Sequence, residues 1–253
     1  MGFDQADLTK DRFLGGLLQI WQPRSGYRAG VDPVLLAAAV AAAPGHHVLD
    51  LGCGAGVASL CLARRVPKLA LTGVEVQDEY AELARRNSAE NNIEMNVVTA
   101  DVSNLPSTLR EQGFDHVISN PPYYRRDRGT PAADAGRDKA LAGDTLLATW
   151  IDAATRRMKP GGYLTIIQNA ERLSDLLRAF DDRLGSVRIK PLAPRAGRSA
   201  ELVLVVARKG GRSALRLLAP LILHQGDRHD RDGESYTQVV SGILRNGDPL
   251  EIG

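Results

Sequence analysis

The sequence predicts an α/β fold in which helices cover both faces of a mostly parallel sheet. Short apolar runs typical of buried strands alternate with longer amphipathic runs typical of helices throughout residues 44–210. The chain has 253 residues, 43% of them hydrophobic, which is enough to form one complete α/β core. Residues 1–43 and 211–253 lie outside this alternation. We expect them to form an N-terminal lid and a C-terminal extension that packs on the core of a single domain.

The predicted strands and helices follow one another in a regular order. Runs with the length and aliphatic content of strands cover His47–Leu51, Leu69–Val76, Met95–Asp101, Phe114–Asn120, Tyr163–Gln168 and Glu201–Arg208. Runs with helical periodicity cover Ala58–Val66, Asp78–Asn91 and Thr145–Met158, the last closed by Lys159–Gly162. An alanine-rich helix is expected to begin near Pro33, with Asp32 as its N-cap.

Composition excludes several classes of protein. A net charge of +2 permits binding to nucleic acid but does not require it. Cys53 and Cys61 have no His or Cys neighbours at metal-binding spacing, so we expect no metal site, no disulfide framework and a reducing cytoplasm. The longest apolar run, Val34–Ala43, has ten residues and is too short to cross a bilayer. We therefore expect a cytoplasmic protein without a membrane partner.

The first chemical motif is VLDLGCGAG, from Val48 to Gly56. Its glycines follow a predicted strand and open a helix, so the backbone can turn tightly and present N–H groups to a ligand. The next strand ends near Glu75, whose carboxylate can accept both hydrogen bonds of a ribose diol, and the third ends at Asp101, which can accept the amino hydrogens of adenine. These residues predict a crevice of nucleoside size, although solvated acids and turn glycines would give the same pattern.

Asp50 distinguishes between nucleoside cofactors. A carboxylate in the glycine loop would repel a pyrophosphate but attract the ammonium or sulfonium group of S-adenosylmethionine. Here residues 50–56, DLGCGAG, resemble the first motif of the class I S-adenosylmethionine-dependent methyltransferases, and Glu75 matches their ribose-binding acid. The resemblance implies a Rossmann-like sheet of seven strands in which the last strand, Glu201–Arg208, is antiparallel.

The resemblance also implies which residues bind S-adenosylmethionine. Residues Tyr27–Asp32 would close over the methionine end of the cofactor, although a simple helix cap is an equally good interpretation of that segment. The other contacts would come from the glycine loop and the ends of strands. The complete expected set is Ala29, Asp32, Asp50, Gly52, Cys53, Gly54, Ala55, Glu75, Val76, Asp101, Val102 and Asn120.

The second motif is SNPPYY, from Ser119 to Tyr124, at the end of the fourth predicted strand. An adenine amine is a weak nucleophile because its lone pair is delocalised into the ring. If the Asn120 side chain and the Pro121 carbonyl each accept one amine hydrogen, the nitrogen becomes more tetrahedral and its lone pair can face a methyl donor. The prolines fix the backbone, and a stacked aromatic ring contributes about 1–3 kcal/mol. We therefore predict that the catalytic residues are Asn120, Pro121, Pro122 and Tyr123.

Two resemblances narrow the substrate. NPPY resembles the fourth motif of methyltransferases that act on planar amines, namely adenine N6, cytosine N4 or glutamine N5. Residues Asp11–Val40 resemble the N-terminal region of the bacterial tRNA adenine-N6 methyltransferase family that modifies the adenine beside the anticodon of a valine tRNA. Arg28, Gly30 and Asp32 match its basic residue, glycine and aspartate, but typical members have lysine and GTD where this chain has arginine and GVD. The resemblance implies N6-methylation of adenine in RNA, with tRNA as the expected substrate.

Basic residues beside the second motif suit an RNA backbone. The segment Tyr124–Asp144 also contains acids, so a solvated loop of mixed charge is about as good an interpretation. The residues expected to contact RNA are Tyr124, Arg125, Arg126 and Arg128.

Other functions remain open at this point. An N5-glutamine methyltransferase of a protein release factor shares NPPY, but that family usually has a helical N-terminal domain, for which residues 1–43 leave little room. A DNA or rRNA adenine-N6 methyltransferase is also compatible, although a DNA enzyme normally needs a target-recognition domain. A regulator or RNA chaperone could bind the cofactor without transferring its methyl group.

Overall fold

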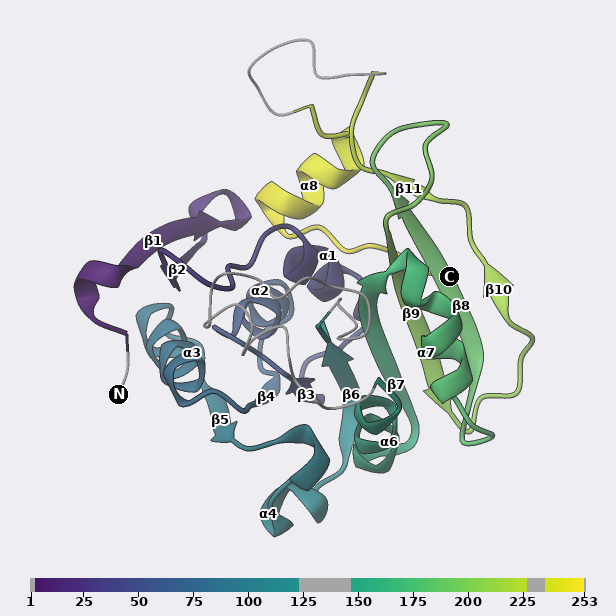
Figure 1. Ribbon diagram of the computed structural model, residues 1–253, viewed down its shortest axis with the longest axis horizontal. Coiled ribbons are helices and arrows are strands. Elements are labelled where there is room, and N and C mark those ends of the chain that lie inside the picture. Colours follow the sequence, from purple (N-terminus) through teal and green to yellow (C-terminus); the bar gives the residue numbers. More distant parts are fainter. Residues whose placement is uncertain (1–2, 123–146, 227–234, 253) are drawn as a thin grey trace, which may run out of the picture.

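The computed structural model describes residues 3–122, 147–226 and 235–252, and it places one large sheet between two layers of helices (Figure 1). The strands of this sheet are β3 (His47–Leu51), β4 (Ala70–Glu75), β5 (Met95–Thr99), β6 (Phe114–Ser119), β7 (Met158–Asn169), β8 (Leu184–Ala193), β9 (Leu202–Lys209), β10 (Arg216–Leu217) and β11 (Leu221–Ile222). The helices are α1 (Asp32–Ala38), α2 (Val57–Arg65), α3 (Asp78–Glu90), α4 (Ser107–Arg110), α6 (Leu147–Arg157), α7 (Leu173–Ala179) and α8 (Gln238–Asn246).

The order of the strands determines where a ligand can bind. Seven strands run in the order β5-β4-β3-β6-β7-β9-β8, and the short strands β10 and β11 pair with β8. Neighbours from β5 to β7 are parallel, whereas β9 is antiparallel to β7 and β8, so the predicted sheet is confirmed. The chain order reverses between β3 and β6, and open α/β sheets bind ligands at the carboxyl ends of the strands at such a point.

Two strands differ from the sequence prediction. β8 was not predicted, because charged residues and a proline interrupt its apolar residues. β7 begins at Met158, so Lys159–Gly162, predicted to close the preceding helix, lies inside the strand at a shift of register. Gly162 permits this path, because a Cβ there would lie 3.1 Å from the carbonyl oxygens of both Phe114 and Asp115.

The helix α1 begins one residue earlier than expected. Val31 already has helical backbone angles, φ −81° and ψ −23°, and its carbonyl accepts the N–H groups of Val34 and Leu35. The expectation that Asp32 is the N-cap is therefore wrong, since Asp32 is the first helical residue. Pro33 then occupies the first turn, where a backbone N–H has no helical partner to lose.

Residues 8–23 form an antiparallel hairpin, β1 (Leu8–Phe13) with β2 (Leu18–Pro23), that the sequence analysis did not predict. Asn87 in α3 and Asn91, the C-cap residue of that helix, pair with the backbone of β2 as a neighbouring strand would. The side-chain oxygens of Asn87 and Asn91 accept the N–H groups of Trp21 and Gln19, and their side-chain nitrogens donate to the carbonyls of the same two residues. The hairpin is thus fixed to the helix that follows β4.

Buried apolar residues form two clusters, one on each face of the sheet. The first includes residues of α1, α2, α3 and α8, and the second includes residues of α4, α6 and α7. The end of the chain joins the first cluster: Leu250 and Ile252 are buried, and the Leu250 N–H donates to the Ala38 carbonyl at 2.8 Å. Within the described residues we find no helix with the length and hydropathy needed to span a membrane.

Candidate active site

The glycine loop connects β3 to α2. Gly52, Gly54 and Gly56 all have positive φ angles, +69°, +53° and +83°, which side-chain-bearing residues rarely adopt. The N–H groups of Gly52 and Cys53 donate to the Val74 carbonyl at 2.8 and 2.9 Å, so the turn is fixed to β4. The tight turn predicted from the sequence is present.

Two aromatic rings contact this loop. A Cβ placed on Gly52 would lie 2.5 Å from the ring of Trp150 in α6, and one on Gly54 would lie 3.8 Å from the ring of Tyr27. Gly52 therefore has a second reason to be glycine, since Trp150 occupies the space that a side chain would need. Trp150 was not predicted from the sequence as a site residue.

Two carboxylates lie behind and beside the loop. Glu75 is 6% exposed and accepts the N–H groups of Gly54 at 3.0 Å and Gln77 at 2.9 Å. Burial raises the pKa of Glu75, and these two hydrogen bonds oppose that shift. Asp50 is 2% exposed and accepts the Ser59 hydroxyl at 2.8 Å. Burial raises the pKa of Asp50 to about 7, opposed by the Ser59 bond and reinforced by the charge of Glu75.

The NPP elbow, residues 120–122, follows β6 directly. Ser119 donates through its hydroxyl to the Leu51 carbonyl at 2.9 Å, which fixes the end of β6 to the end of β3. The Asn120 side-chain nitrogen donates to the Tyr27 hydroxyl at 3.4 Å. The Asn120 Oδ1 atom is buried and accepts no hydrogen bond from any residue that the structure describes. The site therefore contains a buried acceptor that is available to a donor from a ligand.

The segment between β2 and α1 is tied to the hairpin. Gln22 accepts the Ala29 N–H through its side-chain oxygen at 2.7 Å and donates to Asp11 at 2.8 Å. Arg28 also donates to Asp11, at 2.6 Å. Arg28 and Ala29 are therefore held by side chains of the hairpin, next to the residue whose ring covers Gly54.

Tyr27 joins this segment to the elbow. Its backbone carbonyl accepts the Tyr80 hydroxyl at 3.0 Å, and its own hydroxyl accepts from Asn120. Desolvation and the negative charges of Asp32 and Asp50 raise the pKa of Tyr27, so its hydroxyl stays protonated. The predicted lid segment thus contributes a neutral hydroxyl group to the candidate site.

The remaining predicted residues have different environments. Asp101 is exposed and accepts the Ser103 N–H at 2.7 Å, which caps the short 3-10 helix Val102–Asn104. Val102 is buried, and Val76, after Glu75, is 56% exposed. Five predicted residues lie outside the described part of the chain, namely Tyr123, Tyr124, Arg125, Arg126 and Arg128.

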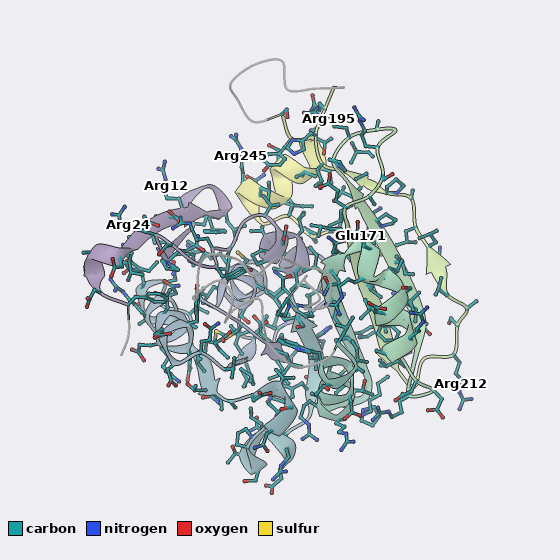
Figure 2. The ribbon with its side chains drawn as sticks, viewed as in Figure 1. Arg12, Arg24, Glu171, Arg195, Arg212 and Arg245 are labelled. Atoms are coloured by element: carbon teal, nitrogen blue, oxygen red, sulfur yellow. The ribbon has the colours of Figure 1, made fainter. Side chains whose placement is uncertain are left out.

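Three residues that contact the loop or the elbow were not predicted individually as site residues: Tyr27, Trp150 and Arg172. Arg172 follows β7 and donates to the Pro122 carbonyl at 3.1 Å; Figure 2 labels its neighbour Glu171 beside the start of α7. Tyr27 carried a partial signal, since it lies in the segment predicted to close over the cofactor. Trp150 and Arg172 carried none, because they come from elements far along the chain that only the fold brings to the loop and the elbow.

The chain belongs to the methyltransferase small domain family, whose family model matches residues 29–189. This match covers the glycine loop, the NPP elbow and the strands from β3 to β7.

Individual relatives are similar to the chain over most or part of its length. The chain is 35% identical over 199 residues to a tRNA1(Val) (adenine(37)-N6)-methyltransferase of Porphyromonas gingivalis, a match that covers 73% of this chain and 77% of the relative. It is 29% identical over 214 residues to the protein of the same name from Dickeya chrysanthemi, covering 81% and 83%. A ribosomal RNA small subunit methyltransferase C of Escherichia coli is 38% identical over 123 residues, covering 49% of this chain and 31% of the relative.

Solved structures agree on the architecture. A predicted O-methyltransferase from Agrobacterium tumefaciens has a TM-score of 0.69 at 30% identity, covering 87% of this chain and 98% of that one. A 16S rRNA N2 methyltransferase from Thermus thermophilus, in complex with AdoMet and guanosine, has a TM-score of 0.56 at 22% identity, covering 80% and 50%, and shows the likeness of fold alone.

Proposed function

We propose that this chain transfers the methyl group of S-adenosylmethionine to N6 of an adenine in RNA, with tRNA as the substrate class. The observation that carries the proposal is the buried Asn120 Oδ1 at the end of β6, an acceptor without a donor among the described residues. Leaving such an acceptor unpaired costs about 1–3 kcal/mol. A planar amine that donates a hydrogen to this atom would remove that cost.

The crevice beside the elbow fits S-adenosylmethionine. The loop from Gly52 to Ala55 would hold its methionine end, with Ala29 and Asp32 closing over it. Glu75 would accept the ribose hydroxyls, since each carboxylate oxygen can accept more than the one hydrogen bond that it has now. The adenine ring would lie at the carboxyl end of β5, against Val76, Asp101 and Val102. When bound, the cofactor supplies an electrophilic methyl group on a sulfonium, whose charge the carboxylate of Asp50 would favour.

The elbow would prepare the substrate amine. Tyr27 accepts from the Asn120 side-chain nitrogen, and the side-chain oxygen has no hydrogen-bond partner among the described residues. The free oxygen of Asn120 and the carbonyl of Pro121 would then each accept one hydrogen of the amine, so that its lone pair is less delocalised into the ring and can face the methyl group. The proton displaced from nitrogen after transfer would pass to water, so no strong general base is required. The prolines keep the Pro121 carbonyl in place, and Tyr123 would stack on the base.

Two observations support RNA as the substrate that contains the adenine amine: the names of the relatives and the exposed arginines. Relatives of this chain are named as enzymes of tRNA and ribosomal RNA. Arg12, Arg24 and Arg245 project outward from the hairpin and from α8 along one edge of the molecule (Figure 2). Exposed guanidinium groups suit a phosphate backbone.

The test is transfer of a radiolabelled methyl group to separate pools of tRNA, rRNA, DNA and release factors, followed by nucleoside analysis. We expect label in tRNA, recovered as N6-methyladenosine. Label in rRNA alone would correct the substrate and keep the chemistry. Label in glutamine of a release factor alone, or no transfer despite cofactor binding, would contradict the proposal.

A further inference from the structure

The two prolines of the NPP elbow have no hydrogen-bond donors of their own. Pro121 and Pro122 have no N–H group, so only their carbonyls can be fixed by hydrogen bonds. The start of the elbow is held, because β6 pairs with β3 and β7 up to Ser119. A donor that fixes the other end must come from a different part of the chain.

Arg172 is that donor. Its guanidinium donates to the Pro122 carbonyl at 3.1 Å, from a side chain that is 17% exposed. Asp175 lies 3.8 Å from Arg172 Nε, too far for a hydrogen bond, and Nε has no hydrogen-bond partner among the described residues. The bond to Pro122 is therefore the one directional contact that the structure assigns to this half-buried cation within the described residues.

The backbone that carries Arg172 is well anchored. The Asn169 side chain accepts the Glu171 N–H at 2.9 Å and caps the 3-10 helix Ala170–Arg172, and the Ala170 N–H donates to the Glu201 carbonyl at 2.8 Å. Arg172 is also the N-cap of α7, which packs on the second apolar cluster through the buried Leu176. A donor carried by such an anchored backbone can restrain a carbonyl better than a donor on a free loop.

We propose that Arg172 is a positioning residue for methyl transfer: it fixes the Pro122 carbonyl, and so keeps the neighbouring Asn120 and Pro121 acceptors at the geometry that the amine requires. This inference rests on the proposed function. Arg172 acts through the elbow and does not itself touch the reacting atoms. Small misplacements of reacting groups can cost about 100-fold in rate, so the contact should matter for turnover more than for binding.

The hydrogen bond can be tested without any activity measurement. Proline precedes tyrosine once in the sequence, at residues 122 and 123. A protein labelled with carbonyl-13C proline and 15N tyrosine therefore gives a single carbonyl-to-amide correlation peak in NMR, which reports on the Pro122 carbonyl. We expect Arg172→Met to move this peak to lower carbonyl chemical shift. The matched control is Arg178→Met, because Arg178 shares Asp175 at 3.4 Å but is 77% exposed, and it should leave the peak in place.

The catalytic consequence is tested with whichever acceptor the parent protein methylates. We expect Arg172→Met to lower kcat about 10-fold to 100-fold, with less than about 3-fold change in KM for the acceptor or Kd for S-adenosylmethionine, and Arg172→Lys to recover part of the loss. Arg178→Met should keep the parent kcat.

Each outcome bears on one proposal. An unmoved peak, an unchanged kcat, or a change in KM alone would overturn the role of Arg172, the last by indicating that it binds substrate phosphate. A parent protein that methylates glutamine and not RNA would contradict the proposed function, while the kinetic comparison still applies to the elbow. A parent without any transfer would contradict the proposed function, and the NMR comparison would still decide whether Arg172 holds the elbow.

Discussion

At the scale of single residues, the proposed chemistry depends on two features. The glycines of the loop have positive φ angles, and the buried Asn120 Oδ1 has no hydrogen-bond partner among the described residues. The places of Gly52, Glu75 and Asn120 at the ends of strands could be predicted from the sequence, because each belongs to a motif that follows or ends an aliphatic run. Tyr27 and Trp150 could not be assigned roles at the loop, because a single aromatic residue in a helix or turn does not indicate which loop its ring will contact. The burial of Asp50 beside Ser59 could not be predicted either, because the motif gives the residue type and not its exposure.

The first prediction concerns Gly52. Gly52→Ala places a Cβ 2.5 Å from the Trp150 ring at a φ of +69°, so both steric overlap and backbone strain oppose it. Gly45→Ala is the matched control, because Gly45 has a φ of +88° and no atom within 4 Å of its Cβ position. We expect Gly45→Ala to lose about 1–2 kcal/mol of unfolding free energy and Gly52→Ala a further 1–3 kcal/mol or so. Equal losses in urea unfolding would show that Trp150 does not constrain the loop.

The second prediction concerns the titration of Asp50. Its pKa in the folded protein is about 7, above the ordinary 3.8, so the folded state binds the proton more tightly than the unfolded state. The contribution of Asp50 to the free energy of unfolding therefore falls as pH rises from about 4 to about 7. The fall is at most about 1.4 kcal/mol per pH unit. Asp50→Asn does not titrate and can still accept from Ser59. Unfolding measured across this range should show the variant gaining stability relative to the parent as pH rises, and parallel curves would contradict the raised pKa.

At the scale of elements, the long parallel strands and their helices could be predicted because aliphatic runs and helical periodicity are continuous there. The hairpin β1–β2 and the strand β8 could not, because their strand character depends on partners. The backbone of β2 forms hydrogen bonds with the side chains of Asn87 and Asn91, and β8 pairs with the antiparallel strand β9. The start of α1 was misplaced because the Asp-Pro pair is compatible with either an N-cap or a first turn.

The third prediction concerns Asn87, which links the hairpin to the glycine loop. Its side chain is fully buried and bonds the Trp21 N–H, the Trp21 carbonyl and the Ala55 carbonyl. Asn87→Ala leaves these groups unpaired, so we expect a loss of about 2–3 kcal/mol in unfolding free energy and weaker binding of S-adenosylmethionine. Asn96→Ala, at an exposed position of β5, is the control and should change stability by less than about 0.5 kcal/mol. If both variants unfold at the same urea concentration, the hairpin is held by other contacts.

At the scale of the whole molecule, the strand order explains why the two motifs meet. The glycine loop ends β3, the NPP elbow ends β6, and these strands are parallel neighbours although 68 residues separate Leu51 from Ser119 in sequence. The reversal of strand order leaves the carboxyl ends of both strands open to a ligand. The sequence could predict this arrangement through its motifs, whereas the contacts of Tyr27 with the glycine loop and of Arg172 with the elbow depend on the tertiary structure.

The most direct test of the central claim is the single-turnover rate of methyl transfer to tRNA by the parent protein and by Asn120→Ala, with Asn96→Ala as the control and N6-methyladenosine as the product measured. We expect Asn120→Ala to lower the rate by at least about 100-fold, while the affinity for S-adenosylmethionine changes less than about 5-fold, because the lost acceptor acts on the amine. Asn96→Ala should react at the parent rate. An Asn120→Ala protein that forms N6-methyladenosine as fast as the parent would contradict the account of the elbow.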